Sequence, residues 1–316
     1  MLYLHAVAPF VPEHSVAIED LRVPLGLSDG EFQLLTRFLG LERIAVAEGL
    51  TTSDMLLAAG EQALAGTDRS RVAYLIHAHA IGHVAPPVFR LAHSLREKLG
   101  LTEARAFALS HQSCVAGLYG LKVAETLLRA EPAGATALIL AGEKIFSPLV
   151  RHLPGTSITG DAAAAVLVGL DGPGDAVIGR AHRTLGEFYR SRDLSPRQQR
   201  RYHHVYVATL ASVIRDAVAD AGLDLEDIRL VLPHNVNRFS WVAAAAAVPF
   251  PLDRVYLENI PKFGHCYCCD PFVNLSTARA QGAAGPGDPV LLVSGGQGAT
   301  FGAAVIRIAD EPRRHG

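Results

Sequence analysis

Short runs of apolar residues alternate along the chain with stretches in which apolar residues recur at helical spacing. The strand-like runs are 72–78, 104–109, 135–141, 163–168, 176–178, 228–232, 255–257, 290–293 and 303–308. The helix-like stretches are 53–65, 87–99, 115–129, 206–221, 241–247 and 274–281. Continuous apolar strands separated by helices are typical of sheets that are covered on both faces, so the pattern predicts mostly parallel sheets in a layered α/β fold.

Two segments with a similar pattern predict that the chain consists of two related halves. Gly160 to Val168 and Gly298 to Ile306 both pass from small residues into β-branched ones. Between them, the sequence Asp171-Gly172-Pro173-Gly174-Asp175 is typical of a turn. We therefore expect an N-terminal half over residues 1–171 and a C-terminal half over residues 172–316.

Composition and charge narrow the class of protein. The chain has 316 residues, of which 49% are hydrophobic and 19% charged, an ordinary composition for a soluble globular protein. The formal net charge of −2 gives no reason to expect nucleic acid or an anionic membrane as a partner. Residues 1–12 lack the basic start of a secretory signal, and no apolar run approaches a membrane span. Three of the four cysteines crowd at 266–269, which is no disulfide framework, so we expect a cytoplasmic protein with reduced thiols.

One cysteine lies at a predicted junction between a strand and a helix. Cys114 occurs in Ser113-Cys114-Val115-Ala116-Gly117, after the strand-like run 104–109 and at the start of the helix-like stretch 115–129. The partial positive charge at the amino end of a helix favours a thiolate, which is a nucleophile. A buried cysteine with only a packing role is the alternative.

Two histidines occupy similar junctions. His234 directly follows the strand-like run 228–232, at the carboxyl end of a strand, where the sites of α/β proteins gather. His265 lies in the loop Phe263-Gly264-His265-Cys266, which precedes a helix-like stretch. A thiolate nucleophile needs a base or a cation beside it. Either histidine alone fits a structural role, but together with Cys114 they form a candidate catalytic set.

Four blocks, in order, resemble the β-ketoacyl-(acyl carrier protein) synthase III family of the thiolase fold. They are Ser113-Cys114-Val115-Ala116-Gly117, Gly160-Asp161-Ala162-Ala163-Ala164-Ala165-Val166, Pro233-His234-Asn235-Val236-Asn237, and Gly295-Gly296-Gln297-Gly298-Ala299-Thr300-Phe301-Gly302. The resemblance implies a five-layered α/β/α/β/α fold and a homodimer. It also implies an acyltransferase that uses acyl-CoA or acyl carrier protein and needs no metal or redox cofactor.

The resemblance also implies roles for individual residues. Cys114 would hold the acyl group as a thioester, and its backbone N–H would bind the oxyanion beside the turn at Gly298. His234 falls on the family's catalytic histidine, and His265 stands where the family has an asparagine. The less certain substrate- or carrier-binding positions are Arg37, Arg238, Asn237 and His111.

The histidine at 265 leaves the reaction open. With His234 it could supply two neutral donors for the enolate of a malonyl thioester, as in decarboxylative Claisen condensation, the reaction that we expect first. A histidine can also remove a proton, so the site could transfer the acyl group to oxygen or nitrogen instead. A non-catalytic partner subunit is a third reading. The unusual loop from His265 to Asp270 favours an uncommon acyl group or acceptor, as in secondary metabolism.

Three other features have weaker functional readings. Zinc binding by His265, Cys266, Cys268 and Cys269 is disfavoured, because the ligands crowd into one short segment with no second pair. The glycines at 295–298 lack the strand, spacing and helix of a nucleotide site. The arginine-rich segment 179–204 fits either a solvated loop or a docking patch for a phosphate-bearing or acidic partner.

Overall fold

A mixed sheet runs through the whole molecule. The computed structural model describes residues 1–81, 86, 88–190 and 193–309. Nine strands pair in the order β11-β12-β13-β10-β1-β9-β6-β4-β5. Their bounds are β1 Leu2–Phe10, β4 Val72–Ala78, β5 Arg105–Leu109, β6 Thr136–Glu143, β9 Ala162–Gly169, β10 Asp175–Thr184, β11 Leu230–Pro233, β12 Pro289–Gly296 and β13 Thr300–Arg307.

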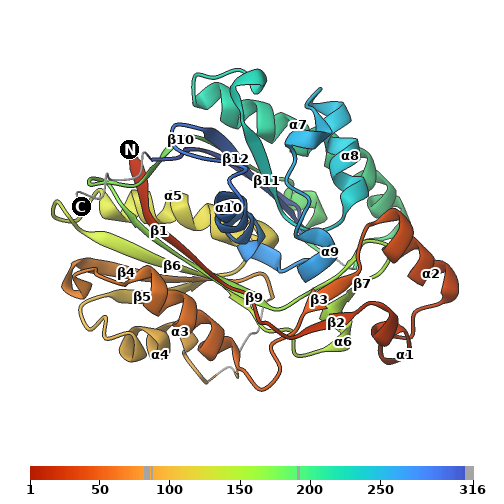
Figure 1. The fold of residues 1–316 in the computed structure, drawn as a ribbon, viewed down its shortest axis with the longest axis horizontal. Helices are drawn as coiled ribbons and strands as arrows, with labels where there is room; N and C mark the ends of the chain where they lie inside the picture. The colour runs from red at the N-terminus through yellow and green to blue at the C-terminus, as the bar shows by residue number, and fades with distance from the viewer. Residues whose placement is uncertain (82–85, 87, 191–192, 310–316) are drawn as a thin grey trace.

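Helices cover this sheet in layers (Figure 1). One outer layer holds α3 (Thr52–Ala63) and α4 (Leu91–Lys98), and the other holds α7 (Pro196–Asp220) and α8 (Arg238–Ala247). Between the two parts of the sheet lie α5 (Ala116–Leu128) and α10 (Asp270–Ala280), packed into a core that draws on strands from both parts. Two further cores fill the spaces under the outer helices. This is the expected five-layered thiolase-like arrangement.

The prediction of mostly parallel sheets is wrong. β4 pairs in parallel with β5 and β6, and β11 with β12, but the other pairings in the large sheet are antiparallel. Most of the strands, such as β6 and β9, are buried along their whole length because helices cover both of their faces. Burial on both faces does not depend on strand direction, so the hydrophobic pattern could not distinguish the two kinds of pairing.

The sequence pattern also missed the strand that joins the two parts of the sheet. β1 lies between β9 and β10, but His5 and Pro9 interrupt its apolar pattern. The expected strand at 255–257 is only an isolated bridge between Val231 and Val255. Strands from residues before 171 form one side of the sheet and those after 172 the other, while the division into two related domains stays a prediction.

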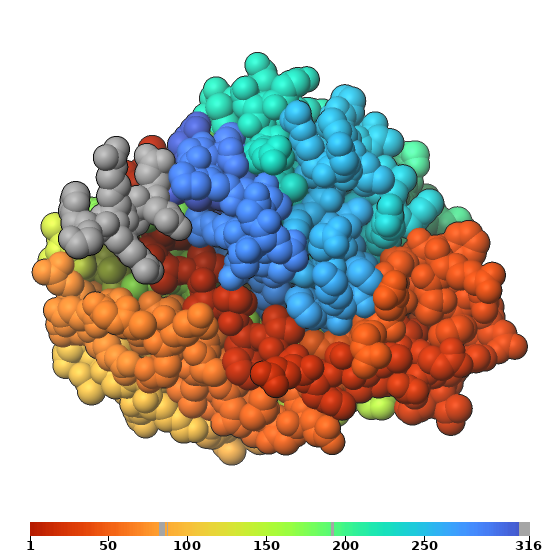
Figure 2. Space-filling model, viewed as in Figure 1, coloured from red at the N-terminus to blue at the C-terminus, as the bar shows by residue number. Residues whose placement is uncertain are grey.

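Short helices, strands and turns complete the fold. The remaining helices and strands are β2 Ser15–Ala17, α1 Arg22–Leu25, α2 Asp29–Gln33, β3 Arg43–Ala45, α6 Pro148–Arg151, β7 His152–Leu153, β8 Ser157–Ile158 and α9 Ile260–Phe263. A π-helical turn, η2, spans Leu34–Phe38, and the 3-10 turns are η1 Glu19–Leu21, η3 Arg69–Arg71, η4 Ser113–Val115, η5 Gly186–Phe188, η6 Leu225–Asp227, η7 Leu252–Arg254 and η8 Tyr267–Cys269. Figure 2 shows the N-terminal segment packed against the C-terminal part of the chain on this face. Across the described residues, no helix has both the length and the apolar character to cross a membrane.

The two central helices approach each other closely beside the nucleophile turn. A Cβ atom at Gly117 in α5 would lie 2.5 Å from the backbone oxygen of Cys268 and 2.9 Å from a ring carbon of Phe272. Backbone atoms cannot move aside as a flexible side chain can. Glycine at 117 therefore allows α5 to contact the segment that leads into α10.

We predict that Gly117→Ala destabilises the protein by about 1–3 kcal/mol, the usual cost of overpacking a core. The measurement is urea unfolding followed by circular dichroism. Gly30→Ala is the matched control, because a Cβ at Gly30 in α2 would have no atom within 4 Å. The control should leave stability unchanged or raise it slightly, since alanine favours a helix over glycine. Equal midpoints for the two variants would contradict the packing argument.

Candidate active site

The nucleophile turn is held by the end of a neighbouring strand. Cys114 lies in η4, between β5 and α5, and is only 7% exposed. The Ser294 hydroxyl donates a hydrogen bond of 2.8 Å to the backbone oxygen of Cys114. A Cβ at Gly296 would lie 3.0 Å from the Cys114 backbone nitrogen, so only glycine lets β12 come this close. Ser113 has a φ of 50°, a strained conformation for a non-glycine residue and one that occurs at functional turns.

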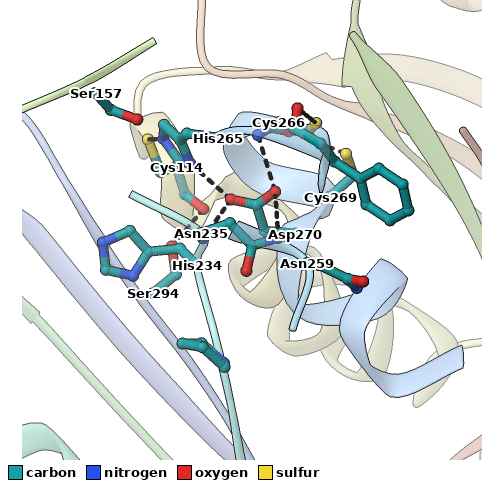
Figure 3. A network of polar contacts seen from close by, with 12 residues as sticks. Cys114, Ser157, His234, Asn235, Asn259, His265, Cys266, Cys269, Asp270 and Ser294 are labelled. Carbon is teal, nitrogen blue, oxygen red and sulfur yellow. Dashed lines mark hydrogen bonds and ion pairs between the residues drawn. The ribbon is translucent and has the colours of Figure 1, made fainter. Parts of the chain in front are cut away.

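Cys114, His265 and Asp270 form a hydrogen-bonded series (Figure 3). The His265 Nε2 atom lies 3.3 Å from the Cys114 Sγ atom. On the other side of the ring, the Nδ1 atom of His265 donates to the Asp270 carboxylate at 2.6 Å. All three side chains are buried. A thiol, an imidazole and a carboxylate in this order have the arrangement of a nucleophile, its base and the group that orients the base.

Backbone and amide N–H groups hold the Asp270 carboxylate. It accepts hydrogen bonds from the backbone nitrogen atoms of Asn235 at 2.6 Å and Cys266 at 2.8 Å. The Asn274 amide in turn donates to the backbone oxygen of Pro233 at 2.7 Å and to the Asn235 side chain at 2.8 Å. A buried carboxylate is costly unless its oxygens are hydrogen-bonded. The network ties the start of α10 to the end of β11 and thereby places Asp270 under His265.

The block that begins at Gly160 supports the His265 loop. The backbone nitrogen of Gly160 donates to the His265 oxygen at 3.0 Å, and the His265 nitrogen donates to Ile158 at 3.3 Å. These two bonds fix the backbone on both sides of the ring. The loop is therefore positioned by β8 and β9 as well as by α10.

Opposing effects set the charge of His265. Burial alone would lower the pKa of His265, but the negative charge of Cys114, the charge of Asp270 and the hydrogen bonds to both raise it to about 10. The imidazole is therefore a cation at neutral pH as long as Cys114 is a thiolate. In this state the protonated ring forms a buried ion pair with Asp270.

His234 is in a different electrostatic state from His265. Burial, and then the nearby charge of His265, lower the pKa of His234 to about 3, so its ring is neutral. Its ring centroid lies 5.8 Å from that of His265, and its Nε2 atom lies 3.2 Å from the Tyr206 hydroxyl. Of these two histidines, it is His265 whose ring nitrogen is hydrogen-bonded to the Cys114 sulfur.

In the described part of the chain, three other predicted site residues, Asn237, His111 and Gly298, have no hydrogen bond to Cys114, His234 or His265. The Asn237 amide donates to the Thr156 oxygen at 3.0 Å, and its side-chain oxygen caps α8. His111 is exposed on the turn before the nucleophile. Gly298 has no atom within 4 Å of a Cβ position, and it is Gly296 that abuts the Cys114 backbone. The proposed roles of Asn237, His111 and Gly298 in binding and catalysis stay predictions.

Arg37 and Arg238 lie on adjoining segments of the surface. Both side chains are exposed, and the backbone nitrogen of Arg238 donates to the Leu39 oxygen at 2.9 Å. Phe38 and Phe239, the residues next to them, are 68% and 62% exposed. Two cations and two aromatic rings thus gather where η2 meets the start of α8. In the arginine-rich segment 179–204, Arg192 lies outside the described residues.

The three cysteines after His265 are packing residues in this structure. Burial raises the pKa of Cys266, Cys268 and Cys269 well above the usual value for a thiol, so they stay protonated at neutral pH. Cys268 donates to the Ala78 oxygen at 3.3 Å and Cys269 to the Cys266 oxygen at 2.9 Å. In the part of the chain that the structure describes, no group of three or more His, Cys, Asp or Glu residues is arranged to hold a metal ion.

Asp270 and Tyr206 are the site residues that sequence reasoning missed. Asp270 precedes Pro271 at the start of α10, where an acidic residue also fits an ordinary helix terminus. Tyr206 lies in α7, just after the arginine-rich segment, and in the sequence it is far from all four blocks. Only the position of Asp270, five residues after His265 in the same loop, carried a usable signal.

A fold with these layers and a cysteine at this turn defines a condensing-type enzyme of the thiolase fold. Residues 218–308 match the family model described as 3-Oxoacyl-[acyl-carrier-protein (ACP)] synthase III C terminal. The chain is 30% identical to β-ketoacyl-[acyl-carrier-protein] synthase III 2 of Streptomyces coelicolor, over 84% of this chain and 82% of that protein. The chain therefore belongs to the β-ketoacyl-[acyl-carrier-protein] synthase III family.

Other relatives agree with this assignment. The synthase III of Nitratidesulfovibrio vulgaris strain DP4 is 27% identical over 96% of this chain and 98% of its own length. The structure of ChlB3, described as an acyltransferase, superimposes with a TM-score of 0.87 at 23% identity and covers 98% of both chains. The synthase III of Pseudomonas aeruginosa PAO1 superimposes with a TM-score of 0.82 at 22% identity, again over 98% of both chains. At these identities the two structural matches establish the fold.

We predict that the stabilising effect of Asp270 depends on pH. The pKa of His265 is raised from 6.5 to about 10 in the folded protein, so its contribution to stability is complete below pH 6.5 and disappears as the pH rises toward 10. Asp270→Asn keeps the shape but removes the charge that favours the imidazolium. The wild type should therefore exceed the variant in unfolding free energy most at the acidic end of this range, as measured by urea unfolding at several pH values.

Asp253→Asn is the control for this experiment, because Asp253 is an exposed residue of η7. Its effect should be small and nearly independent of pH across the same range. A difference between wild type and Asp270→Asn that grows toward alkaline pH would contradict the assigned charge of His265.

Proposed function

We propose that this enzyme takes an acyl group from a CoA or carrier-protein thioester onto Cys114 and transfers it to a hydroxyl or amino group without decarboxylation. The observation that carries the proposal is the hydrogen bond between His265 and Asp270, on the far side of the ring from Cys114. It makes His265 a base held in one orientation. Transfer to oxygen or nitrogen requires a base, because the acceptor must lose a proton.

In the first half-reaction, the Cys114 thiolate attacks the thioester carbonyl carbon. A new carbon–sulfur bond forms to Cys114, and the bond to the carrier sulfur breaks. The His265 Nε2 atom gives its proton to the departing carrier thiolate. The products are an acyl-Cys114 thioester, a free carrier thiol and a neutral His265 that still donates to Asp270.

Loading the acyl group changes the electrostatics of His265. A thioester carries no charge, so the negative charge of Cys114, which helps to raise the pKa of His265, disappears. Burial then favours the neutral ring. In the second half-reaction, His265 takes the proton of the acceptor as it attacks the acyl carbon, and Cys114 leaves as a thiolate. The ion pair of the resting site is restored.

Decarboxylative condensation with a malonyl thioester is the second candidate, and the curated relatives with the synthase III name favour it. In that reaction the carbanion arises from loss of carbon dioxide, so no proton has to be removed from the acceptor. It needs donors for an enolate oxygen, which the neutral His234 suits. The carboxylate behind His265 assists loading of Cys114 in both reactions, but only transfer to oxygen or nitrogen also needs the oriented base, and for that reason we place acyl transfer first.

We propose that the thioester donor docks where Arg37 and Arg238 meet. Phosphate groups and an acidic carrier surface would pair with the two guanidinium groups. The exposed rings of Phe38 and Phe239 would contact the apolar part of the pantetheine arm or the carrier surface. No metal or redox cofactor enters the proposed steps.

The test of the function is to incubate the enzyme with acetyl-, butyryl- and octanoyl-CoA and measure its intact mass. We expect an acyl adduct in the wild type that is absent from Cys114→Ala. Cys269→Ala is the matched control and should load normally, since its thiol only donates to the Cys266 backbone. No adduct in the wild type with any of these donors, or with acyl carrier protein, would favour a non-catalytic partner subunit.

The same loaded enzyme distinguishes the two reactions. We expect amines and alcohols to remove the acyl group, and malonyl-CoA to yield no carbon dioxide. In His265→Asn, transfer to these acceptors should fall by about 100-fold or more, the usual contribution of a general base. Carbon dioxide release with a β-keto product would instead establish condensation, and retention of that activity in His265→Asn would show that the family's usual donors suffice.

We also propose a homodimer that pairs through the edge of the sheet at β5. This strand has a hydrogen-bonded neighbour, β4, on one side only, and its residues are partly exposed. An open edge next to the nucleophile turn is a ready site for pairing with a second copy. Light scattering after size exclusion should give twice the chain mass of 33.6 kDa. A mass of one chain at micromolar concentration would contradict the dimer.

A further inference from the structure

The Cys114 side chain has apolar as well as polar neighbours. His265 is a polar neighbour, with its Nε2 atom 3.3 Å from the sulfur. Cys114 also belongs to a small hydrophobic cluster, whose other buried members are Ile145 and Tyr267. The partly buried residues that pack against this cluster are Ala80, Ile81 and Val150. We call these five residues the apolar wall of Cys114.

The physical chemistry of an acyl chain favours contact with this apolar wall. A thioester carries no charge, and the rest of a simple acyl group is hydrocarbon, which is stabilised by contact with apolar side chains. Placed against His265 or His234, the same hydrocarbon would cover buried polar groups without offering them a hydrogen bond, which is unfavourable. The apolar wall therefore marks the side of Cys114 toward which the acyl chain extends.

Tyr267 contributes the largest side chain to the apolar wall and is held in place on several sides. Its hydroxyl donates a hydrogen bond of 2.7 Å to the Val150 backbone oxygen, and its ring centroid lies 5.1 Å from that of His265. The residue is only 8% exposed. Its φ is 55°, a conformation that a bulky residue keeps only where the surrounding structure fixes it. The ring is therefore a rigid part of the apolar wall.

The position of this ring limits the space for an acyl chain. A short acyl group adds few atoms to the Cys114 sulfur. A long chain that extends along the apolar wall meets the Tyr267 ring, and moving the ring aside would break its hydrogen bond to Val150. Overfilling a packed site also forces neighbouring side chains out of their preferred rotamers. The energetic cost of loading therefore rises with the length of the chain.

We propose that Tyr267 is a specificity-determining residue, which limits the length of the acyl chain that Cys114 can carry. The preferred donor is a short-chain acyl thioester. The inference rests on the proposed acyl loading of Cys114, the step that both candidate reactions share, and it adds the chemical class of the group that is loaded. It holds whether the acyl group then goes to carbon, oxygen or nitrogen.

The test compares acetyl-, butyryl- and octanoyl-CoA as donors at matched concentrations. Formation of each acyl adduct is followed by intact mass, and the result is the ratio of the octanoyl rate to the acetyl rate. If the wild type loads only from acyl carrier protein, the same ratio is measured with the acyl carrier proteins. In the wild type we expect a ratio of about 0.1 or less, since even one ill-fitting methylene group can change a rate by about tenfold. Tyr267→Gly removes the ring and suits the positive φ, and it should raise the ratio by about tenfold or more.

Two control variants separate the ring of Tyr267 from its hydroxyl and from a general loss of stability. Tyr267→Phe keeps the ring, so its ratio should stay within about threefold of the wild-type value. Tyr256→Gly is the matched control, because Tyr256 is another buried tyrosine, 4% exposed, whose hydroxyl donates to the Gln281 side chain at 2.9 Å. Any slowing that it causes should be equal for all three donors. A ratio within one variant does not depend on how much of that variant is folded.

Ile145→Ala opens the apolar wall at a second residue, and it should also raise the ratio, which keeps the test decisive if Tyr267→Gly does not fold. A wild type that loads octanoyl groups as fast as acetyl groups would overturn the inference and leave acyl loading of Cys114 intact. An unchanged ratio in Tyr267→Gly would do the same, because the ring would then not set the limit. A wild type that forms no adduct with these donors or with acyl carrier protein refutes the proposed function at its first step, and the inference with it.

Discussion

The structure depends on the hydrogen-bonded burial of one carboxylate, that of Asp270. Its oxygens accept from the His265 ring and from the backbone nitrogen atoms of Asn235 and Cys266. These donors come from two loops, one after β11 and the other after α9. Because an uncompensated buried charge costs several kcal/mol, the loops can move apart only together with a large loss of stability. The same carboxylate that fixes the backbone therefore fixes the His265 ring.

The ends of three strands lie around the candidate site and position its residues. β11 ends just before His234, β12 ends beside Cys114, and the Gly160 backbone at the start of β9 holds the His265 loop. Glycine at 296 allows the strand to contact the nucleophile turn without a side chain between them. The catalytic distances follow from these backbone contacts, so small changes at residues that touch no substrate can alter the reaction.

Sequence patterns predicted the layers and most strands because burial on both faces leaves long apolar runs. They did not predict strand direction, which burial does not determine, or β1, whose His5 and Pro9 conceal its central position. Junction positions marked both Cys114 and His265 as candidates, a family block marked Cys114 as well, and the structure brings the two side chains to 3.3 Å from each other. Asp270 was missed because an acidic residue at a helix start has an ordinary explanation. Tyr206 was missed because it contacts His234, far away in the sequence, and no local pattern records such a contact.

The histidine at 265 and the aspartate at 270 make physical sense only as a pair. A buried histidine without a charged partner becomes a neutral ring, like His234, whose pKa falls to about 3. At His265 the charge of Cys114 and that of Asp270 reverse this effect and raise the pKa to about 10. In the acyl transfer that we propose, one of the two negative charges is gone once Cys114 carries an acyl group, and the ring becomes a base at the moment when an acceptor must be deprotonated. Under this proposal the state of Cys114 switches His265 from acid to base, and an asparagine at 265 could perform neither step.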